Sequence, residues 1–188
     1  IRFVRNLQAK SKSDDQQPTV GPLTAAELQA AELVTLRDVQ RRHFDGEARC
    51  LREGSPVQRS SRIRNLSPFV DGEGILRVGG RLGHAPLAFA SRHPAILPSA
   101  DPVTHLIIAH AHQRVLHSGM ERTLTEVRLR YWPCRGRSLV KHVIHKCQLC
   151  KRRRCRPQTP KMADLPASRF DESRAFSTVG VDYFGPME

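Results

Sequence analysis

The chain has 188 residues, of which 39% are hydrophobic and only 5% aromatic, so a single large core is not expected. Basic residues outnumber acidic ones by 31 to 18, and most of the resulting net charge of +13 lies between His110 and Lys161. Such a concentration of charge favours a polyanionic partner, most often nucleic acid, over a merely solvated surface. No apolar run has the length of a membrane span, and the N-terminal residues do not resemble a signal peptide, so no membrane partner is expected.

Residues 1–23 are expected to be the tail of an upstream segment followed by a polar linker, as in a piece of a longer chain. Thr24 and Glu27 then form the pattern of a capping box, in which the threonine hydroxyl and the glutamate carboxylate each accept a backbone N–H. Apolar residues at helical spacing follow, so we predict an amphipathic helix from Thr24 to about His43, ended by Gly46.

Two short apolar stretches around Asp71–Gly74 predict a β-hairpin. In its second strand, apolar residues from Leu76 to Leu82 alternate with basic ones, which predicts one apolar and one basic face. The segment Ala95–Leu97, between two prolines, predicts a further short strand. We therefore expect a helix and hairpin module over residues 24–100, with a small core formed by Leu28, Leu36, Phe69 and Val78.

Residues 101–155 predict a domain of three short helices. Asp101 is a suitable N-cap before Pro102 and begins a helix that ends near His112. A second helix is indicated by the helical spacing of Met120, Leu124, Val127 and Tyr131. Ser138 can cap a third helix, whose inner face would contain Leu139, Val140, Val143, Ile144 and Cys147.

Histidines and cysteines at the two ends of this segment form a candidate metal site. His112, His117, Cys147 and Cys150 offer two imidazoles and two thiolates, the donors that tetrahedral Zn²⁺ prefers. Four protein ligands leave no open position, which favours a structural ion, and three helices of this size are marginally stable without one. His110 is an alternative to His112. Weaker rivals are His142, His145, Cys134 and Cys155.

The same segment carries the candidate nucleic-acid contacts. Basic side chains on the predicted helices and after the last cysteine can meet phosphate groups. The residues concerned are Arg128, Arg130, Arg135, Arg137, Lys141, Lys151, Arg152, Arg153 and Arg154. The run Lys151–Arg154 is equally compatible with a nuclear import signal, so a nuclear location is expected after synthesis in the cytoplasm.

The C-terminal part differs in character from the helical domain. Residues 156–175 contain three prolines and no hydrophobic periodicity, which predicts an extended linker. Residues 176–188 include the apolar, β-rich stretch FSTVGVDYFGP, which predicts the first strand of a domain that this chain does not contain.

Several of these segments together resemble the integrase region of LTR retrotransposon polyproteins, specifically those of the BEL/Pao group. The resemblance is carried by LTAAELQAAELVTLRDVQ, LSPFVDGEGILRVGGRL, HPAILPS, AHQRVLHSGMERTLTEVRLRYWPCRGRSLVKHVIHKCQLCKR and FSTVGVDYFGP. It implies a zinc-stabilised, helix-turn-helix-like unit over residues 101–155. It also implies that residues 176–188 begin an RNase H-like catalytic core.

The resemblance further implies that Asp182 matches the first of three catalytic carboxylates, which hold Mg²⁺ or Mn²⁺ in a complete integrase core. The second and third carboxylates would follow Glu188, so no activity is expected from this chain alone. In outline the chemistry agrees, because an aspartate in an apolar strand is costly to bury unless it is paired or bound to metal.

The expected fold is therefore α+β and mostly helical, with a helix and hairpin module, a zinc-stabilised three-helix domain and a truncated RNase H-like core. The expected function is a zinc-binding, nucleic-acid-binding integrase fragment that contacts the ends of retroelement cDNA and target DNA. Two alternatives are a zinc-dependent module for integrase self-association, with a homo-oligomer as the product, and a DNA-binding protein descended from a transposon.

Overall fold

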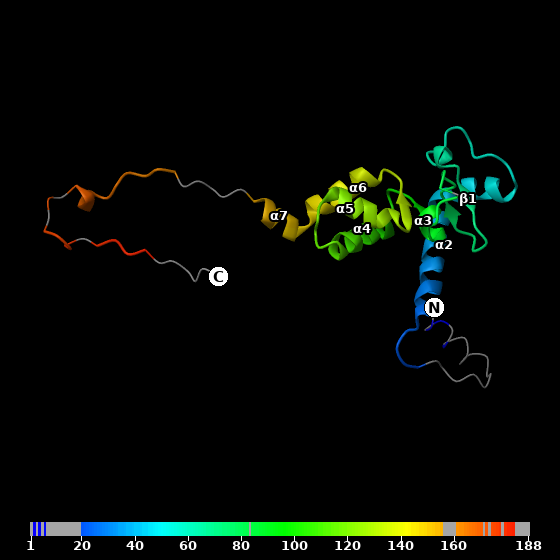
Figure 1. Ribbon diagram of the computed structural model, residues 1–188, viewed down its shortest axis with the longest axis horizontal. Coiled ribbons are helices and arrows are strands. Elements are labelled where there is room, and N and C mark those ends of the chain that lie inside the picture. Colours follow the sequence, from blue (N-terminus) through cyan, green and yellow to red (C-terminus); the bar gives the residue numbers. More distant parts are fainter. Residues whose placement is uncertain are drawn as a thin grey trace. The chain divides into compact units, whose positions relative to one another are not determined.

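The computed structural model describes residues 20–82, 84–155, 161–170, 172, 174–177 and 179–182, together with Arg2, Val4 and Asn6. Residues 1–154 form one compact unit and residues 155–188 a second, smaller one. In the first unit a long helix and a small sheet lie beside a group of short helices (Figure 1). None of the helices in the described part of the chain combines the length and the apolar character that crossing a membrane requires.

Helix α2 (Ala25–Arg52) begins as the capping box predicts. The Thr24 hydroxyl accepts a hydrogen bond from the Glu27 N–H, and the Glu27 carboxylate accepts one from the Thr24 N–H. The prediction that Gly46 ends the helix is wrong, because α2 runs on to Arg52 with only a kink at Phe44 (φ −136°, ψ 24°). One glycine costs a helix only about 1 kcal/mol, which the packing of the following turns outweighs.

The buried face of α2 differs in part from the predicted one. Leu36, Val39, Gln40 and Phe44 are buried, whereas Leu28 is 55% exposed and does not belong to the core. Figure 1 shows the reason, since the first turns of α2 extend beyond the strands. Helical periodicity identifies an apolar face but not the point at which its partner surface ends.

The sheet has the strand order β1-β2-β3-β4. The hairpin of β1 (Phe69–Val70) and β2 (Leu76–Arg77) is confirmed, and β3 (Ala95–Leu97) pairs antiparallel with β2. Strand β4 (Tyr131–Pro133) was not predicted; it pairs in parallel with β3 and thereby joins two segments that the sequence analysis treated as separate modules.

The predicted basic face of the second strand is wrong. Arg77 is 9% exposed and its guanidinium pairs with Asp71 in the hairpin turn, and Leu82, placed on the apolar face, is exposed. The strand ends after Arg77, so the side chains that follow do not alternate between two faces of a sheet. At Gly79 the chain leaves the direction of the strand and approaches Ser67 closely. The Gly79 N–H donates to Ser67 O, and a Cβ added to Gly79 would lie 2.2 Å from that oxygen.

Gln40 fixes α2 to the sheet. Its side-chain amide nitrogen donates to Leu76 O and to Ile96 O, both at 2.8 Å, and its amide oxygen accepts from the Leu76 N–H at 2.7 Å. The side chain thus acts as a bridging peptide group between β2 and β3, where direct strand pairing is limited to Arg77 and Ala95.

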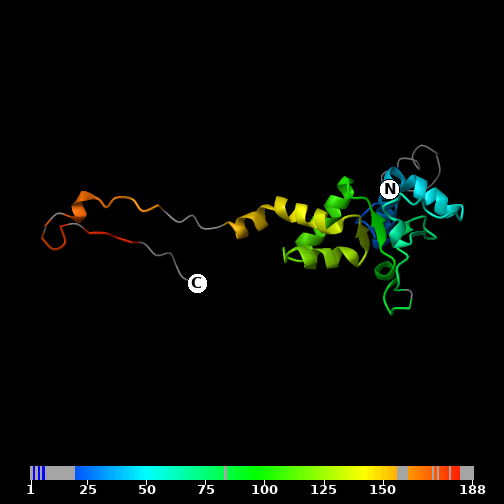
Figure 2. The same cartoon turned by 90° about the horizontal axis from the view of Figure 1, so that it is seen from above.

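The helical segment contains α4 (Pro102–Arg114), α5 (Met120–Arg128), α6 (Gly136–Lys146) and a further short helix, α7 (Gln148–Arg154). The Asp101 cap is confirmed, since its carboxylate accepts from the Val103 N–H at 2.9 Å. Two details are wrong: Tyr131 lies in β4 rather than on the second helix, and α6 begins at Gly136, so Ser138 is inside it. Figure 2 shows α4 to α6 packed together next to the sheet.

The helices enclose a core of their own. Its buried members are Ile108, Ala111, Leu124, Val127, Val140, Ile144 and Cys150. The predicted inner face of the third helix is confirmed, since Val140 and Ile144 are buried and Leu139, Val143 and Cys147 pack against the same cluster. On α4 the pattern is shifted, with Thr104 and Ile108 buried and Leu106 exposed.

The second unit carries little regular structure in its described residues. Among these described residues a 3-10 turn, Ala167–Arg169, lies between irregular and exposed segments, and the linker over residues 156–175 stays a prediction. The short helix α3 (Phe89–Arg92) precedes β3 in the first unit. The described residues among 176–182 form no strand, and residues 183–188, over which the predicted strand would continue, lie outside the described residues. The observed fold is therefore mostly helical with a small sheet.

Candidate metal centre

Four separate pieces of backbone deliver the predicted zinc ligands. His112 lies in the last turn of α4 and His117 in the loop that follows, whereas Cys147 is the C-cap of α6 and Cys150 lies in the first turn of α7. His112 and Cys150 are buried, and the other two side chains are partly exposed. The predicted set is thus assembled at one corner of the helical core.

The ligand atoms lie close enough together to share one tetrahedral zinc ion. His112 Nε2 lies 2.9 Å from His117 Nδ1 and 3.2 Å from Cys150 Sγ. His117 Nδ1 lies 3.4 Å from Cys147 Sγ and 3.7 Å from Cys150 Sγ. Bonds of about 2.0–2.1 Å to nitrogen and 2.3 Å to sulfur require edges of about 3.3–3.8 Å in a tetrahedron. The two distances from His117 Nδ1 to sulfur lie in this range, whereas the two distances to His112 Nε2 are shorter and would lengthen by about 0.4 Å around an ion. All four atoms lie within 4.8 Å of one another, so His112, His117, Cys147 and Cys150 are positioned to hold one zinc ion.

The loop after α4 turns His117 back toward the helix. Leu116 (φ 52°) and His117 (φ 61°) both adopt left-handed backbone, and the His117 N–H donates to His112 O at 3.0 Å. Each such residue without the freedom of glycine costs on the order of 1 kcal/mol, a strain that is typical of functional sites. Gly119, the next residue but one, also has a positive φ of 91°, which glycine adopts without strain, and α5 begins directly after it.

Thr123 on α5 orients the first ligand. Its hydroxyl lies 3.3 Å from His112 Nδ1 and donates to Gly119 O at 2.7 Å. Because the hydroxyl hydrogen is used on the carbonyl, the threonine oxygen accepts from an Nδ1–H, which leaves Nε2 unprotonated for the metal. This role could not be predicted from the sequence, since a threonine inside an amphipathic helix carries no spacing signal.

The surroundings favour the ligating forms of His112 and Cys147. Burial lowers the pKa of His112, and repulsion from His117 and Arg154 acts in the same direction, so the imidazole stays neutral. The backbone N–H of Cys150, followed by that of Leu149, stabilises the Cys147 thiolate and lowers its pKa. Burial raises the pKa of Cys150, as expected for a thiol in apolar surroundings.

The rival ligands lie elsewhere. His110 is exposed on α4, His145 is exposed on α6, and the ring of His142 lies 5.9 Å from that of His105. Cys134 packs against the core beneath the sheet, and Cys155 is exposed beyond α7. The geometry therefore selects His112 over His110, and among the described residues the cluster contains no fifth histidine or cysteine ligand.

The basic side chains proposed for nucleic acid fall into two groups. Arg130 is ion-paired with Glu32 at 2.8 Å, and Arg137 with Glu121 at 2.8 Å. Arg128 lies over the Trp132 ring, with Cζ 4.6 Å from its centroid. The other six are likewise exposed and form no ion pair within the described residues: Arg135, Lys141, Lys151, Arg152, Arg153 and Arg154.

Asp182 lies in the second unit and is exposed. The structure brings it into no cluster of metal-binding side chains in the part of the chain that it describes. Its assignment as a catalytic carboxylate stays a prediction.

Comparison with known proteins agrees with the geometry. Residues 101–156 match the sequence model of the integrase zinc-binding domain, which supports an integrase region within this chain. The matched segment contains all four ligands, so this part is an H2C2 zinc-binding domain. No curated protein and no solved structure matches the chain significantly.

Proposed function

We propose that the zinc-binding domain of this integrase region binds DNA, and that the bound ion holds the helix that makes the main contact. The observation that carries this proposal is the position of Cys150, which lies on α7 directly before four exposed cations, Lys151 to Arg154. A ligand and the basic run thus share one short helix.

Helix α7 depends on its anchor. It has seven residues, and an isolated helix of this length is not stable in water. Cys150 packs into the helical core. A zinc ion bound to its sulfur would also bind the ligands on α4, on the loop after α4 and at the end of α6, and would thereby hold α7 against all three. Loss of the ion should therefore release the helix and spread its four charges over a flexible chain.

Other cations extend the expected contact surface. Arg135 and Lys141 are exposed on and before α6, and we expect them to add phosphate contacts. Arg130 and Arg137 are expected to contribute less, because Glu32 and Glu121 already neutralise them. Arg128 can contribute only if it leaves the Trp132 ring.

The finer assignment rests on sequence motifs. We propose that the chain derives from a BEL/Pao-type retrotransposon and acts on cDNA ends and target DNA in the nucleus. Asp182 would supply the first carboxylate for Mg²⁺ or Mn²⁺ in a complete RNase H-like core. The fragment alone would not catalyse DNA integration, since one exposed aspartate holds a divalent ion weakly.

A salt series tests the DNA proposal. Duplex binding is measured by fluorescence anisotropy for the zinc-loaded chain, and four phosphate contacts predict a log–log salt slope of about −3 to −4. Replacing Lys151, Arg152, Arg153 and Arg154 with glutamine should abolish most of the slope. The matched control replaces Arg52, Arg59, Arg64 and Arg81, which are exposed, form no ion pair within the described residues and lie outside the zinc-binding domain, and it should lose far less. Equal losses in the two variants, or no binding at low salt, would refute the proposal.

A specific observation favours self-association as a second function. Leu106 is 69% exposed on α4, and with Ala109 and Val143 it lines a groove between α4 and α6. Polar side chains line the rest of this groove, among them His105, His142 and Lys146. An exposed apolar patch with a polar rim suits a second copy of the chain. Sedimentation of the wild type and of Leu106→Glu, each with and without chelator, tests this. A wild-type monomer under both conditions would rule it out.

A further inference from the structure

The first unit contains a cavity of about 780 Å³. The kink of α2 at Phe44, the loop from Gln58 to Leu66, the turn Pro98–Ala100 and the end of β4 enclose it. None of the four zinc ligands lines it. Its volume falls within the range of about 300–1,000 Å³ that is usual for small-molecule sites.

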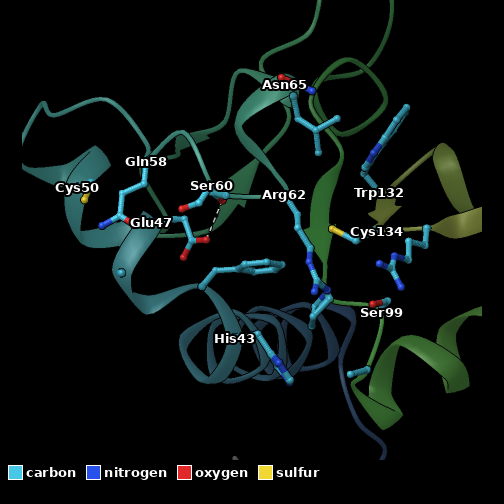
Figure 3. A pocket seen from close by; sticks show the side chains of 17 residues that line it. His43, Glu47, Cys50, Gln58, Ser60, Arg62, Asn65, Ser99, Trp132 and Cys134 are labelled. Atoms are coloured by element: carbon cyan, nitrogen blue, oxygen red, sulfur yellow. Dashed lines mark hydrogen bonds between the residues drawn. The ribbon is translucent and has the colours of Figure 1, made fainter.

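The two ends of the cavity differ in chemistry. Figure 3 shows Glu47, Gln58 and Ser60 near one end and Trp132 and Cys134 near the other, with Arg62 between them. Arg135, whose backbone is left-handed (φ 58°), lines the Trp132 end as well. The cavity therefore offers an aromatic surface and cations on one side and neutral or acidic hydrogen-bonding groups on the other.

Arg62 and Arg135 are the two arginines that line the cavity. Within the described residues no ion pair is formed by either of them, whereas Arg42, Arg77, Arg130 and Arg137 each pair with a carboxylate. The nearest acid in the cavity, Glu47, accepts a hydrogen bond from the Ser61 hydroxyl at 2.8 Å. Two unpaired guanidinium groups beside one tryptophan suit an anion that carries a planar ring.

Trp132 can present one side of its ring to a ligand. Arg128 lies over the indole but does not line the cavity, so it contacts the ring from outside. The side chain is only partly buried against the core formed by Phe44, Ile63, Leu76, Val78 and Ile96. Stacking of a base on an aromatic ring is a common source of affinity in single-strand binding proteins.

We propose that this cavity binds a nucleoside 5′-phosphate, with the base on Trp132 and the phosphate on Arg62 and Arg135. Gln58, Ser60 and Asn65 supply donors and acceptors for the base edge and the sugar. The unit can come from a free nucleotide or from an unpaired nucleotide at a strand end. A nucleotide inside a duplex cannot enter, since its base is stacked and paired. The site shares Arg135 with the DNA surface proposed above but no residue with the basic run of α7, so it does not depend on the contact proposed for that run.

The chain offers a direct probe, because Trp132 is its only tryptophan. Titration of the zinc-loaded full chain with a nucleoside monophosphate, a short single strand, a blunt duplex or inorganic phosphate is followed by tryptophan fluorescence. We expect saturable quenching by the monophosphate or the single strand, and none by the duplex or by phosphate. Binding of the monophosphate, of the single strand or of both supports the site. If both bind, the tighter ligand shows whether the nucleotide comes from a free pool or from a strand end.

Matched variants separate the cavity from general charge effects. Arg62→Gln should weaken binding about tenfold or more, as expected for a lost charge-assisted contact, whereas Arg59→Gln, exposed and outside the cavity, should not. Arg135→Asn, which suits the left-handed backbone, should behave like Arg62→Gln. Equal affinities for Arg62→Gln and Arg59→Gln, quenching by phosphate alone, or loss of binding when the α7 cations are replaced would overturn the proposal. The last result would leave the DNA proposal intact.

Discussion

The hydroxyl of Thr123 accepts a hydrogen bond from the Nδ1–H of His112, over 3.3 Å, and donates one to Gly119 O. This short chain connects the start of α5 to a ligand at the end of α4. It settles which imidazole nitrogen faces the metal before any ion binds, so part of the ordering cost of the site is met by the protein fold.

Thr123→Val should therefore weaken zinc binding without removing a ligand. The isosteric valine leaves the His112 Nδ1–H buried without an acceptor, and loss of such a partner typically lowers metal affinity about 10–100-fold. Competition with a chromophoric chelator measures the change. Thr125→Val is the matched control, since Thr125 is exposed on the same helix and bonds only Glu121 O. An equal effect of the two variants, or a normal affinity for Thr123→Val, would contradict the role given to Thr123.

Removal of one zinc ligand should unfold the helical segment. Cys147→Ser or His117→Ala is expected to abolish stoichiometric zinc and to melt residues 103–150, because binding energy of the ion is folding energy in so small a core. Elemental analysis and circular dichroism measure the two effects. Cys155→Ser and His110→Ala are the controls and should retain one zinc per chain. Full helicity in the ligand variants would show that the core formed by α4 to α7 is stable by itself.

The features that could be predicted from the sequence are those that depend on a few residue types or on a few neighbouring residues. The ligand set could be predicted because Zn²⁺ restricts donors to few residue types, and the Thr24 and Asp101 caps because a cap is decided within a few residues. Strand β4 could not, because Tyr131 continues a helical spacing and becomes a strand residue only by pairing with β3. The parallel pairing of distant segments leaves no mark on local periodicity.

The roles of Gln40 and Arg77 could not be predicted from the sequence for a related reason. A glutamine in an amphipathic helix is ordinarily placed in solvent, but this one replaces strand pairing between β2 and β3. Arg77 was expected on a basic surface and is instead nearly buried against Asp71. Polar residues in a core are identified by their partners, and those partners lie far away in the sequence.

Gln40→Leu should destabilise the sheet end of the first unit. The variant leaves the Leu76 N–H without its partner in a buried position, and Leu76 O and Ile96 O each lose a donor. An unsatisfied buried group costs about 1–3 kcal/mol, so a loss of at least that size is expected in urea unfolding of the zinc-loaded chain. Gln29→Leu, at an exposed position of the same helix, should change stability by less than about 0.5 kcal/mol. Similar midpoints for the two variants would show that the Gln40 bridge is not needed.

Two glycines should respond to alanine in opposite directions. Gly79 has no room for a side chain, because its Cβ would lie 2.2 Å from the Ser67 carbonyl oxygen, and Ser67 itself is held in a left-handed turn. Gly79→Ala must therefore displace backbone, with an expected loss of about 1–3 kcal/mol. Gly46 lies within α2, where nothing lies within 4 Å of the added Cβ, so Gly46→Ala should stabilise the helix by about 0.5–1 kcal/mol. Thermal unfolding of both variants with zinc bound tests the pair. A stability gain for Gly79→Ala would show that the turn at Ser67 is not closed in solution, and a loss for Gly46→Ala would show that the kink of α2 requires glycine.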